Sequence, residues 1–181
     1  MFKREDLEIN PVSKTNWDDF EALFEERGGP KYCWCMAWRM TKEELKDNTP
    51  ERRKEYIKKR IFTGVPVGLL GYIHGEPAAW CSIAPRETYR RIGGDETKDA
   101  VWSLACFYVK RCFRRRGIAD ALLGAAAAYA KAGGAKYVEA YPVEEDSPSY
   151  RFMGLVKQFE RAGFSYIKKE GSRRNVMTLE L

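Results

Sequence analysis

A chain of 181 residues is long enough for one domain with a sizeable core and too short for two domains of typical size. Its hydrophobic content of 44% excludes a disordered chain, and no apolar run approaches the length that spans a membrane. Its net charge of +6 is moderate, and much of it falls within residues 110–116, which favours a small polyanionic ligand over an extended nucleic-acid surface.

The first third of the sequence is predicted to contain one strand and two helices. Residues 7–12 are predicted to form a short strand, because β-forming residues precede a proline there. A helix then begins at Asn16 and stops at Gly28. A second helix begins at Thr49, which precedes a proline, and stops at Gly64.

From residue 66 onward, short runs of β-forming residues alternate with two helical segments. The runs predict strands over residues 67–73, 78–84, 101–109, 137–141, 165–169 and 175–181. The first two strands form a hairpin, and its turn accounts for His74, the only histidine. An alanine-rich helix begins at Gly117, and residues 149–161 are predicted to form a last helix with Phe152 and Phe159 on one face.

The segment between the predicted strand over residues 101–109 and the alanine-rich helix combines three features of an anion-binding site. The first N–H groups of a helix lack partners within the helix and lie at the positive end of its dipole. Gly117 has no side chain to keep a ligand away from the backbone. Arg114, Arg115 and Arg116 add fixed positive charge. The sequence therefore predicts a diphosphate site, with a solvated basic turn as the alternative interpretation.

Two motifs in this half of the chain resemble the GNAT superfamily of N-acetyltransferases. Arg114-x-x-Gly117-x-Ala119, placed after an apolar strand, is similar to the acetyl-CoA signature of that family, Arg/Gln-x-x-Gly-x-Gly/Ala. Phe159-Glu-Arg-Ala-Gly-Phe164 is similar to the family motif Tyr-Glu-Lys-x-Gly-Phe, which closes the last large helix. The resemblance covers about residues 66–181 and, more loosely, the helical N-terminal part.

The resemblance implies a fold and an activity. The fold is α/β, a single-domain GNAT-like fold over residues 1–181, with a central mixed, mostly antiparallel twisted sheet flanked by helices on both faces. Residues 1–65 would be a helical part on the acceptor side, and residues 66–181 the sheet and the coenzyme-binding part. The activity would be direct transfer of an acetyl group from acetyl-CoA, the donor substrate, to a primary amine of a small molecule or peptide. A non-catalytic acyl-CoA-binding or sensing module is the alternative.

The coenzyme-binding residues that the resemblance implies lie at the end of the predicted strand over residues 101–109 and in the loop and helix start that follow it. They are Phe107, Tyr108, Val109, Arg114, Arg115, Arg116, Gly117, Ile118 and Ala119. In the family, backbone N–H groups of this strand polarise the thioester carbonyl, which is the kind of stabilisation that acyl transfer needs.

The catalytic residues are less evident, because the tyrosine that commonly protonates the departing thiolate aligns with Phe159. Tyr150, at the start of the same predicted helix, is the best substitute as general acid, and a half-buried packing residue is the alternative interpretation. Glu139 is the candidate general base, because a charged residue inside a predicted strand needs a partner or a wet cleft.

Residues 32–39 combine two cysteines, two tryptophans and a methionine after a Gly-Gly-Pro breaker. In the GNAT family this region forms the acceptor pocket, so Trp34, Trp38, Trp80 and Ser82 are predicted to line it. An aromatic lid of this kind suits an acceptor that is partly apolar or cationic. A packed core is the alternative interpretation. No metal site is predicted, because the Cys-x-Cys pair has no second Cys/His pair at ligand spacing.

The remaining expectations concern location and partners. Five cysteines, an odd number, fit free thiols in a reducing compartment. The N-terminus has no apolar signal core, so the protein is expected to be cytoplasmic. The expected partner is the amine acceptor, with no nucleic acid and no membrane, and the protein is expected to be a monomer or a homodimer.

Overall fold

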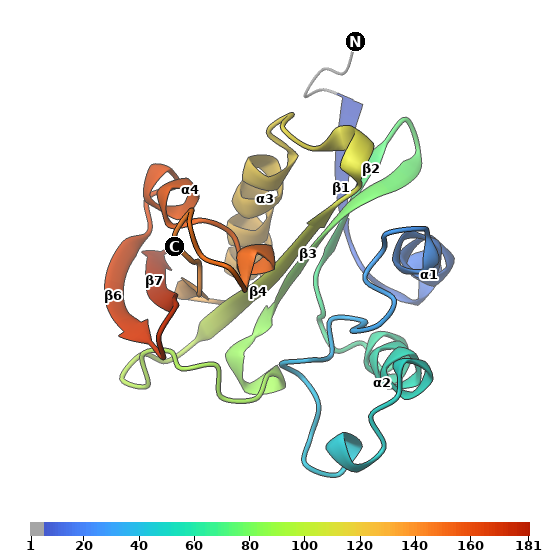
Figure 1. The fold of residues 1–181 in the computed structure, drawn as a ribbon, viewed down its shortest axis with the longest axis horizontal. Coiled ribbons are helices and arrows are strands. Elements are labelled where there is room, and N and C mark those ends of the chain that lie inside the picture. The colour runs from blue at the N-terminus through green and yellow to red at the C-terminus, as the bar shows by residue number, and fades with distance from the viewer. Residues whose placement is uncertain (1–5) are drawn as a thin grey trace.

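Seven strands form one twisted sheet in the order β1-β2-β3-β4-β5-β7-β6 (Figure 1). The computed structural model describes residues 6–181. The N-terminal segment that was predicted to have no apolar signal core includes residues 1–5, which lie outside the described residues. The strands are β1 (Leu7–Pro11), β2 (Leu69–Ile73), β3 (Glu76–Pro85), β4 (Val101–Val109), β5 (Tyr137–Ala140), β6 (Ser165–Glu170) and β7 (Arg174–Glu180). All neighbours are antiparallel except β4 and β5, which are parallel. The predicted mixed, mostly antiparallel sheet is therefore confirmed.

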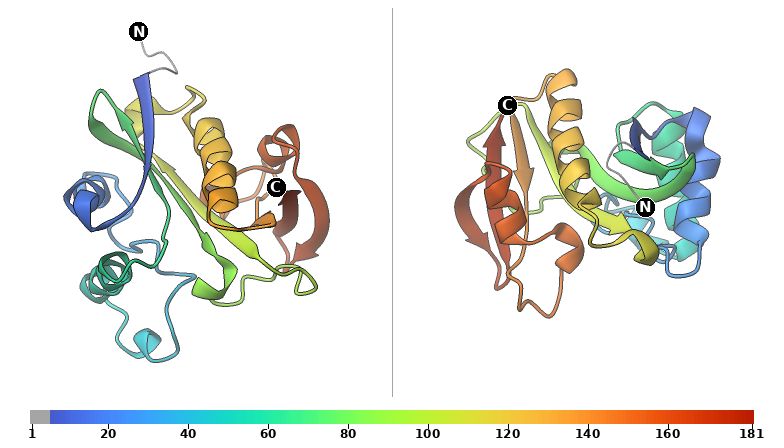
Figure 2. Two further views of the ribbon diagram at one scale, coloured as in Figure 1. Left: turned by 180° about the vertical axis from the view of Figure 1, so that it is seen from behind. Right: turned by 90° about the horizontal axis from the view of Figure 1, so that it is seen from above.

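Helices cover both faces of the sheet, as predicted (Figure 2). They are α1 (Trp17–Glu25), α2 (Pro50–Phe62), α3 (Ile118–Ala132) and α4 (Val156–Arg161). Side chains alternate between the faces along each strand, so Cys81 of β3 packs on the side of α3 and Trp80 on the side of α1 and α2. In the part of the chain described, no helix has the length and apolarity needed to cross a membrane.

Several elements end where local signals in the sequence predicted. The Thr49 hydroxyl accepts the N–H of Arg52 at 3.3 Å and caps α2, which stops two residues before Gly64. The turn between β2 and β3 consists of His74 and Gly75, with φ of 51° and 79°. Two successive left-handed residues are typical of a tight hairpin turn, so the assignment of His74 to a turn is confirmed.

The predicted helix over residues 149–161 is wrong, because the chain breaks in the middle of it. A single 3₁₀ turn, Arg151–Met153, is followed by Gly154 with φ of 92° and by an extended Leu155, and only then does α4 begin. A Cβ on Gly154 would lie 2.5 Å from the Phe159 ring, so the chain makes this bend only with glycine. The predicted apolar face is therefore split, with Phe159 buried and Phe152 44% exposed.

One glycine within α3 and one at its C-terminal end are expected to change stability in opposite directions when each is replaced by alanine. Gly124 is exposed and a Cβ there would meet no atom within 4 Å, so Gly124→Ala is expected to stabilise the protein by about 0.5–1 kcal/mol. A Cβ on Gly133 would collide with the Trp102 ring, so Gly133→Ala is expected to destabilise it by about 1–3 kcal/mol. Urea unfolding of the two variants measures both values. Equal effects would contradict this packing of α3 on the sheet.

Candidate functional site

The centre of the sheet opens where β4 and β5 part. The two strands pair only from Val101 opposite Tyr137 to Leu104 opposite Ala140, after which β5 ends and β4 continues to Val109. On its other side β4 stays paired with β3 throughout, although a bulge leaves Ala105 without a partner. The second half of β4 therefore has a neighbouring strand on one side only.

The open side of β4 carries backbone donors. The N–H of Lys110 donates to Ala78 of the β3 side at 2.9 Å, and because successive residues point in opposite directions, the backbone groups of Phe107 and Val109 point away from β3. The Val109 carbonyl accordingly accepts the Arg114 Nε–H at 3.0 Å. The N–H groups of Phe107 and Val109 face the opening between the parted strands.

The loop that follows β4 connects the open end of this strand with the N-terminus of α3. It contains a 3₁₀ turn, Arg111–Phe113, and two left-handed residues, Arg115 with φ of 62° and Gly117 with φ of 74°. A Cβ on Gly117 would meet no protein atom within 4 Å, so lack of space does not require glycine here. The left-handed backbone conformation of Gly117 does favour glycine. The side chains of Arg114, Arg115 and Arg116 are exposed, whereas Ile118 is buried beneath the loop and Ala119 is half-buried.

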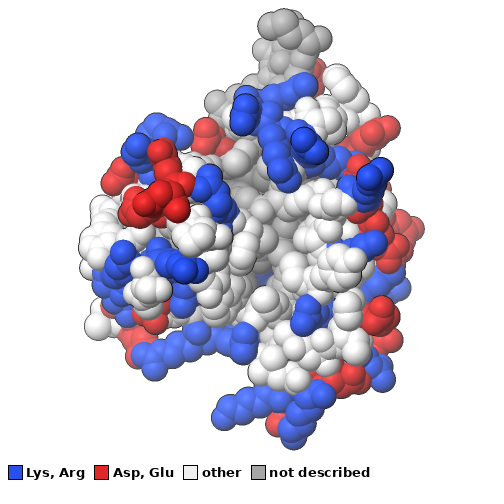
Figure 3. Space-filling view, viewed as in Figure 1, with Lys and Arg blue, Asp and Glu red and all other residues white. Residues whose placement is uncertain are grey.

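Positive charge gathers at one end of a hollow between the two halves of the molecule (Figure 3). An open cavity of about 620 Å³ adjoins the loop and is lined by Tyr108 of β4 together with Glu26, Arg27, Gly28, Lys110, Arg111, Cys112 and Arg114. Its one acidic residue is already paired, because Glu26 lies 2.7 Å from the Lys110 ammonium. The cavity therefore presents excess positive charge beside the loop that leads to α3.

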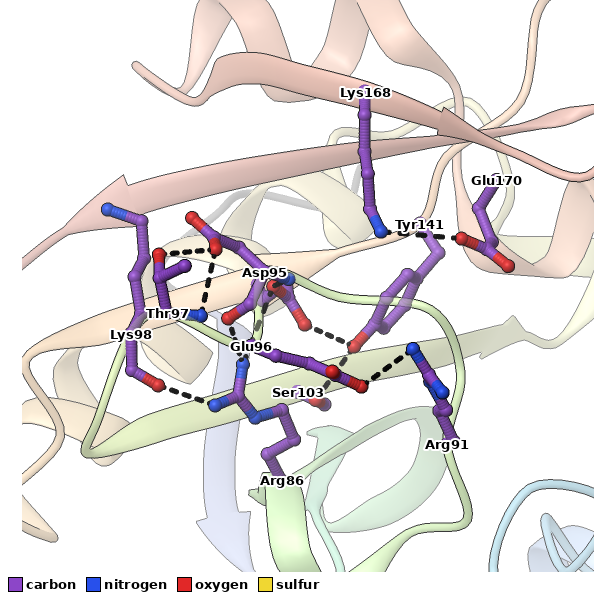
Figure 4. A network of polar contacts seen from close by, with 11 residues as sticks. Arg86, Arg91, Asp95, Glu96, Thr97, Lys98, Ser103, Tyr141, Lys168 and Glu170 are labelled. Carbon is purple, nitrogen blue, oxygen red and sulfur yellow. Dashed lines mark hydrogen bonds and ion pairs between the residues drawn. The ribbon is translucent and has the colours of Figure 1, made fainter.

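Glu139 is wholly buried in β5, and both of its oxygens are occupied. Figure 4 shows the network of polar contacts to which Arg86, Asp95, Ser103 and Tyr141 belong. The Tyr141 hydroxyl donates to Oε1 at 2.6 Å, and the Asp95 N–H donates to Oε2 at 2.7 Å. The Arg86 guanidinium lies 3.8 Å from Oε2 and donates to the backbone carbonyls of Asp95 and Lys98. The carboxylate thus fastens the β3–β4 connection to β5, and its link to the outside passes through Tyr141.

Tyr141 borders a second open cavity, of about 350 Å³, on the face of the sheet opposite α3. The other lining residues are Arg86, Tyr89, Arg90, Arg91, Ile92, Gly93, Gly94 and Glu96. The Tyr141 hydroxyl also lies 2.9 Å from Ser103 Oγ. Burial, and then the neighbouring Glu139 carboxylate, raise the pKa of Tyr141 well above its usual value, so the hydroxyl stays protonated at neutral pH.

Tyr150 lies at the edge of this region in a left-handed conformation, with φ of 61° and 36% of its surface exposed. Its ring centroid is 6.5 Å from that of Trp38, and the 3₁₀ turn that follows it packs against β4. Phe159, which takes the place of the family tyrosine, is buried with its ring centroid 6.2 Å from that of Phe107. Tyr150 is therefore partly exposed, beside Trp38 and next to a turn that packs on β4.

The four residues predicted to line the acceptor pocket are not brought together. Trp34 and Trp80 are buried in the core between α1 and the sheet, where each packs on Phe24. Ser82 is also buried. Only Trp38 lies beside Tyr150. For Trp34 and Trp80, the arrangement favours the packed-core interpretation over the aromatic lid.

Sequence reasoning did not identify Tyr89, Arg90, Tyr141 or Arg174 as site residues. Arg90 and Arg174 place their guanidinium carbons 5.9 and 4.8 Å from the centre of the Trp38 ring. No motif signals them, because they come from segments that meet only in the folded sheet. Among the described residues, no group of three or more His, Cys, Asp or Glu side chains is arranged to hold a metal ion.

The comparisons with known proteins agree with this geometry. The model of the acetyltransferase (GNAT) family matches residues 19–164. A GCN5-related N-acetyltransferase from Kribbella flavida is 18% identical with a TM-score of 0.61, covering 99% of this chain and 100% of the other. YncA from Salmonella typhimurium, solved with acetyl-CoA, is 16% identical with a TM-score of 0.59, covering 97% and 94%. The PaiA N-acetyltransferase from Thermoplasma acidophilum, solved with coenzyme A, is 15% identical with a TM-score of 0.56, covering 97% and 99%. The search of curated proteins gave no match.

The buried hydroxyl of Tyr141 predicts a pH dependence of stability. A tyrosine whose pKa is raised on folding contributes stability below its unfolded pKa, about 10, and loses that contribution as the pH rises toward its folded pKa. The difference in unfolding free energy between the wild type and Tyr141→Phe is expected to stay constant from about pH 7 to 9 and then to shrink by up to about 1.4 kcal/mol per pH unit. Urea unfolding over a pH series measures it. A difference that stays constant above pH 10 would contradict the burial of this hydroxyl.

Proposed function

The chain belongs to the acetyltransferase (GNAT) family, and from that premise we propose that it transfers an acetyl group from acetyl-CoA to a primary amine of a small molecule or peptide. The observation that carries the proposal is the half-paired end of β4, which leads directly into an arginine-rich loop at the N-terminus of α3. One strand thus supplies donors for an acyl carbonyl, and the loop after it supplies donors for phosphates.

The donor substrate would lie in the opening between β4 and β5. The N–H groups of Phe107 and Val109 would pair with its pantetheine and polarise the thioester carbonyl, as donors aimed at a developing oxyanion do. Its diphosphate would bind the backbone N–H groups of residues 114–119, where the helix dipole and the three arginines favour negative charge. The side chain of Tyr108 lies on the opposite face of β4. It would border the phosphate end of the coenzyme, because it lines the cavity beside the loop.

The acceptor amine would enter from the side of Tyr141 and Tyr150. A primary amine with a pKa of about 10.4 is protonated near neutral pH, so it must lose a proton before its nitrogen attacks the thioester carbon. We assign this proton to Glu139, relayed by the Tyr141 hydroxyl that already donates to it at 2.6 Å. As the new C–N bond forms and the C–S bond breaks, Tyr150 would give the thiolate its proton, and the second proton that the nitrogen loses on becoming an amide would restore the Tyr150 hydroxyl.

A non-catalytic acyl-CoA-binding module is the second candidate function. It is favoured by Phe159, which occupies the position of the family tyrosine, is buried and has no proton to donate. A protein of this kind would bind coenzyme A at the same loop without releasing thiol in the presence of any amine.

The loop can be tested by removing two of its charges. Arg114→Ala combined with Arg116→Ala is expected to weaken coenzyme A binding by about 100-fold or more, since each charge-assisted hydrogen bond contributes roughly 1.5–3 kcal/mol. Calorimetry measures the affinity. The matched control is Lys131→Ala with Lys136→Ala, which removes the same charge from exposed positions at and beyond the opposite end of α3. Unchanged affinity in the loop variant, or an equal loss in both variants, would contradict a phosphate site at this loop.

The chemistry can be tested by following free thiol with acetyl-CoA and a panel of primary amines. The wild type is expected to release thiol with at least one amine, and Tyr150→Phe is expected to lower kcat by roughly 100-fold because it removes a general acid. Tyr166→Phe, on the exposed surface of β6, is the control. Coenzyme binding without any thiol release would favour the non-catalytic module, and an unchanged kcat in Tyr150→Phe would exclude this tyrosine as the acid.

A further inference from the structure

Two arginines beside the acceptor side of the sheet lack acidic partners. Arg90 donates to the carbonyl of Ala37, and Arg174 donates to the carbonyl of Ile92 at 2.6 Å. Within residues 6–181, neither guanidinium forms an ion pair with a carboxylate. Each guanidinium has five N–H donors, so most of them remain available to a ligand.

Both guanidiniums lie against the same aromatic wall. Arg90 and Arg174 are 5.9 and 4.8 Å from the Trp38 ring centre, and Arg174 is also 5.8 Å from that of Tyr150. The main-chain N–H of Arg90 donates to the Trp38 carbonyl at 2.7 Å, which fixes the loop against this wall. The buried Trp38 Nε1–H has no hydrogen-bond partner in the described part of the chain, so this place has an unused donor as well.

The acidic side chains around this wall are already engaged. Glu96 pairs with Arg91 at 2.9 Å, and Glu170 lies 3.6 Å from the Lys168 ammonium. Glu144 accepts a hydrogen bond from an amide on β7 at 3.2 Å, and Glu139 is buried. The region therefore has unpaired positive charge, which opposes a polycationic acceptor and favours an anionic one.

An apolar cluster links this wall to the opening beside β4. Trp38 packs against an apolar cluster that includes Ala105 and Tyr141. Ala105 is the bulged residue at the mouth of the opening, two positions before Phe107 on β4. Since two residues of a strand span roughly 7 Å, the cluster reaches β4 within that distance of Phe107.

Resting on the proposed acetyl transfer, we propose that the acceptor is an amino acid whose carboxylate binds Arg90 and Arg174 over Trp38 while its amino group points toward Tyr141. Guanidinium groups bind carboxylates through paired, charge-assisted hydrogen bonds, which fix orientation as well as affinity. The apolar cluster behind Trp38, which includes Ala105, Tyr141 and Met153, then favours an acceptor with an apolar side chain.

The test compares L-amino acids with apolar side chains against their amides, which keep the amine and lose the carboxylate charge. In the wild type, the amino acids are expected to have kcat/KM about tenfold or more above their amides. In Arg90→Gln with Arg174→Gln, KM for the amino acids is expected to rise about tenfold or more with little change in kcat, whereas the amides should be unaffected. Glutamine keeps a donor for the Ala37 and Ile92 carbonyls, which guards the fold.

The control and the contrary outcomes are distinct from those of the acetyl-transfer proposal. Arg161→Gln, an exposed arginine at the end of α4, should leave both acceptor classes unchanged. Equal turnover of amides and amino acids, or an unchanged KM in the double variant, would overturn the carboxylate site while leaving acetyl transfer intact. If no amine releases thiol, the acetyl-transfer proposal fails, and calorimetry of apolar amino acids with the coenzyme-A-saturated protein still decides the site. Binding lost in the double variant supports the site, and no binding by the wild type overturns it.

Discussion

The parting of β4 from β5 after Leu104 and Ala140 is the constraint on which the other features of the site depend. A strand paired on one side leaves the backbone donors and acceptors of its other side without partners, and a protein interior does not leave such groups unsatisfied. An opening in the middle of a sheet, rather than at its edge, therefore needs water or a ligand of extended shape. Because α3 begins soon after the same strand, one element fixes both the unpaired backbone donors of β4 and the N-terminal end of the helix, which we propose bind the thioester carbonyl and the diphosphate.

The buried carboxylate of Glu139 explains how the connection between β3 and β4 is held against β5. An ionised group in an apolar interior costs several kcal/mol unless its oxygens are bonded, and here one oxygen binds the Tyr141 hydroxyl and the other the Asp95 N–H. The same connection carries Arg90 and Ile92, so fixing it at Asp95 helps to orient residues that line the cavity beside Tyr141. A positioning role and a role in proton relay are compatible, because both use the Tyr141–Glu139 hydrogen bond.

The sequence predicted those parts of the fold and site that depend on neighbouring residues. The strand over residues 101–109 and the helix after Gly117 were found because a β-forming run and a helical repeat each have a local period. The break at Gly154 was missed, because helical periodicity continues across it, and the close approach of the Phe159 ring that requires a glycine there is visible only in the fold. Arg90 and Arg174 were missed, because no local pattern reports that a loop and a distant strand will meet over one tryptophan.

The segment with two cysteines and two tryptophans shows how one short motif serves both the core and the site. Trp34 and Cys35 adopt left-handed φ of 46° and 49°, a conformation that is costly for residues other than glycine and persists only when the surrounding packing enforces it. This bend sends Trp34 into the core, where the Trp80 indole donates to Cys35 Sγ at 3.0 Å, and leaves Trp38 beyond it. The next residue, Arg39, is buried and binds Ser82 Oγ at 2.9 Å and the Tyr89 hydroxyl at 2.5 Å. Trp38 is therefore held by the same buried residues that bind Tyr89 of the β3–β4 connection. Changes in the core next to Arg39 should accordingly alter the proposed acceptor site before they alter the proposed phosphate loop.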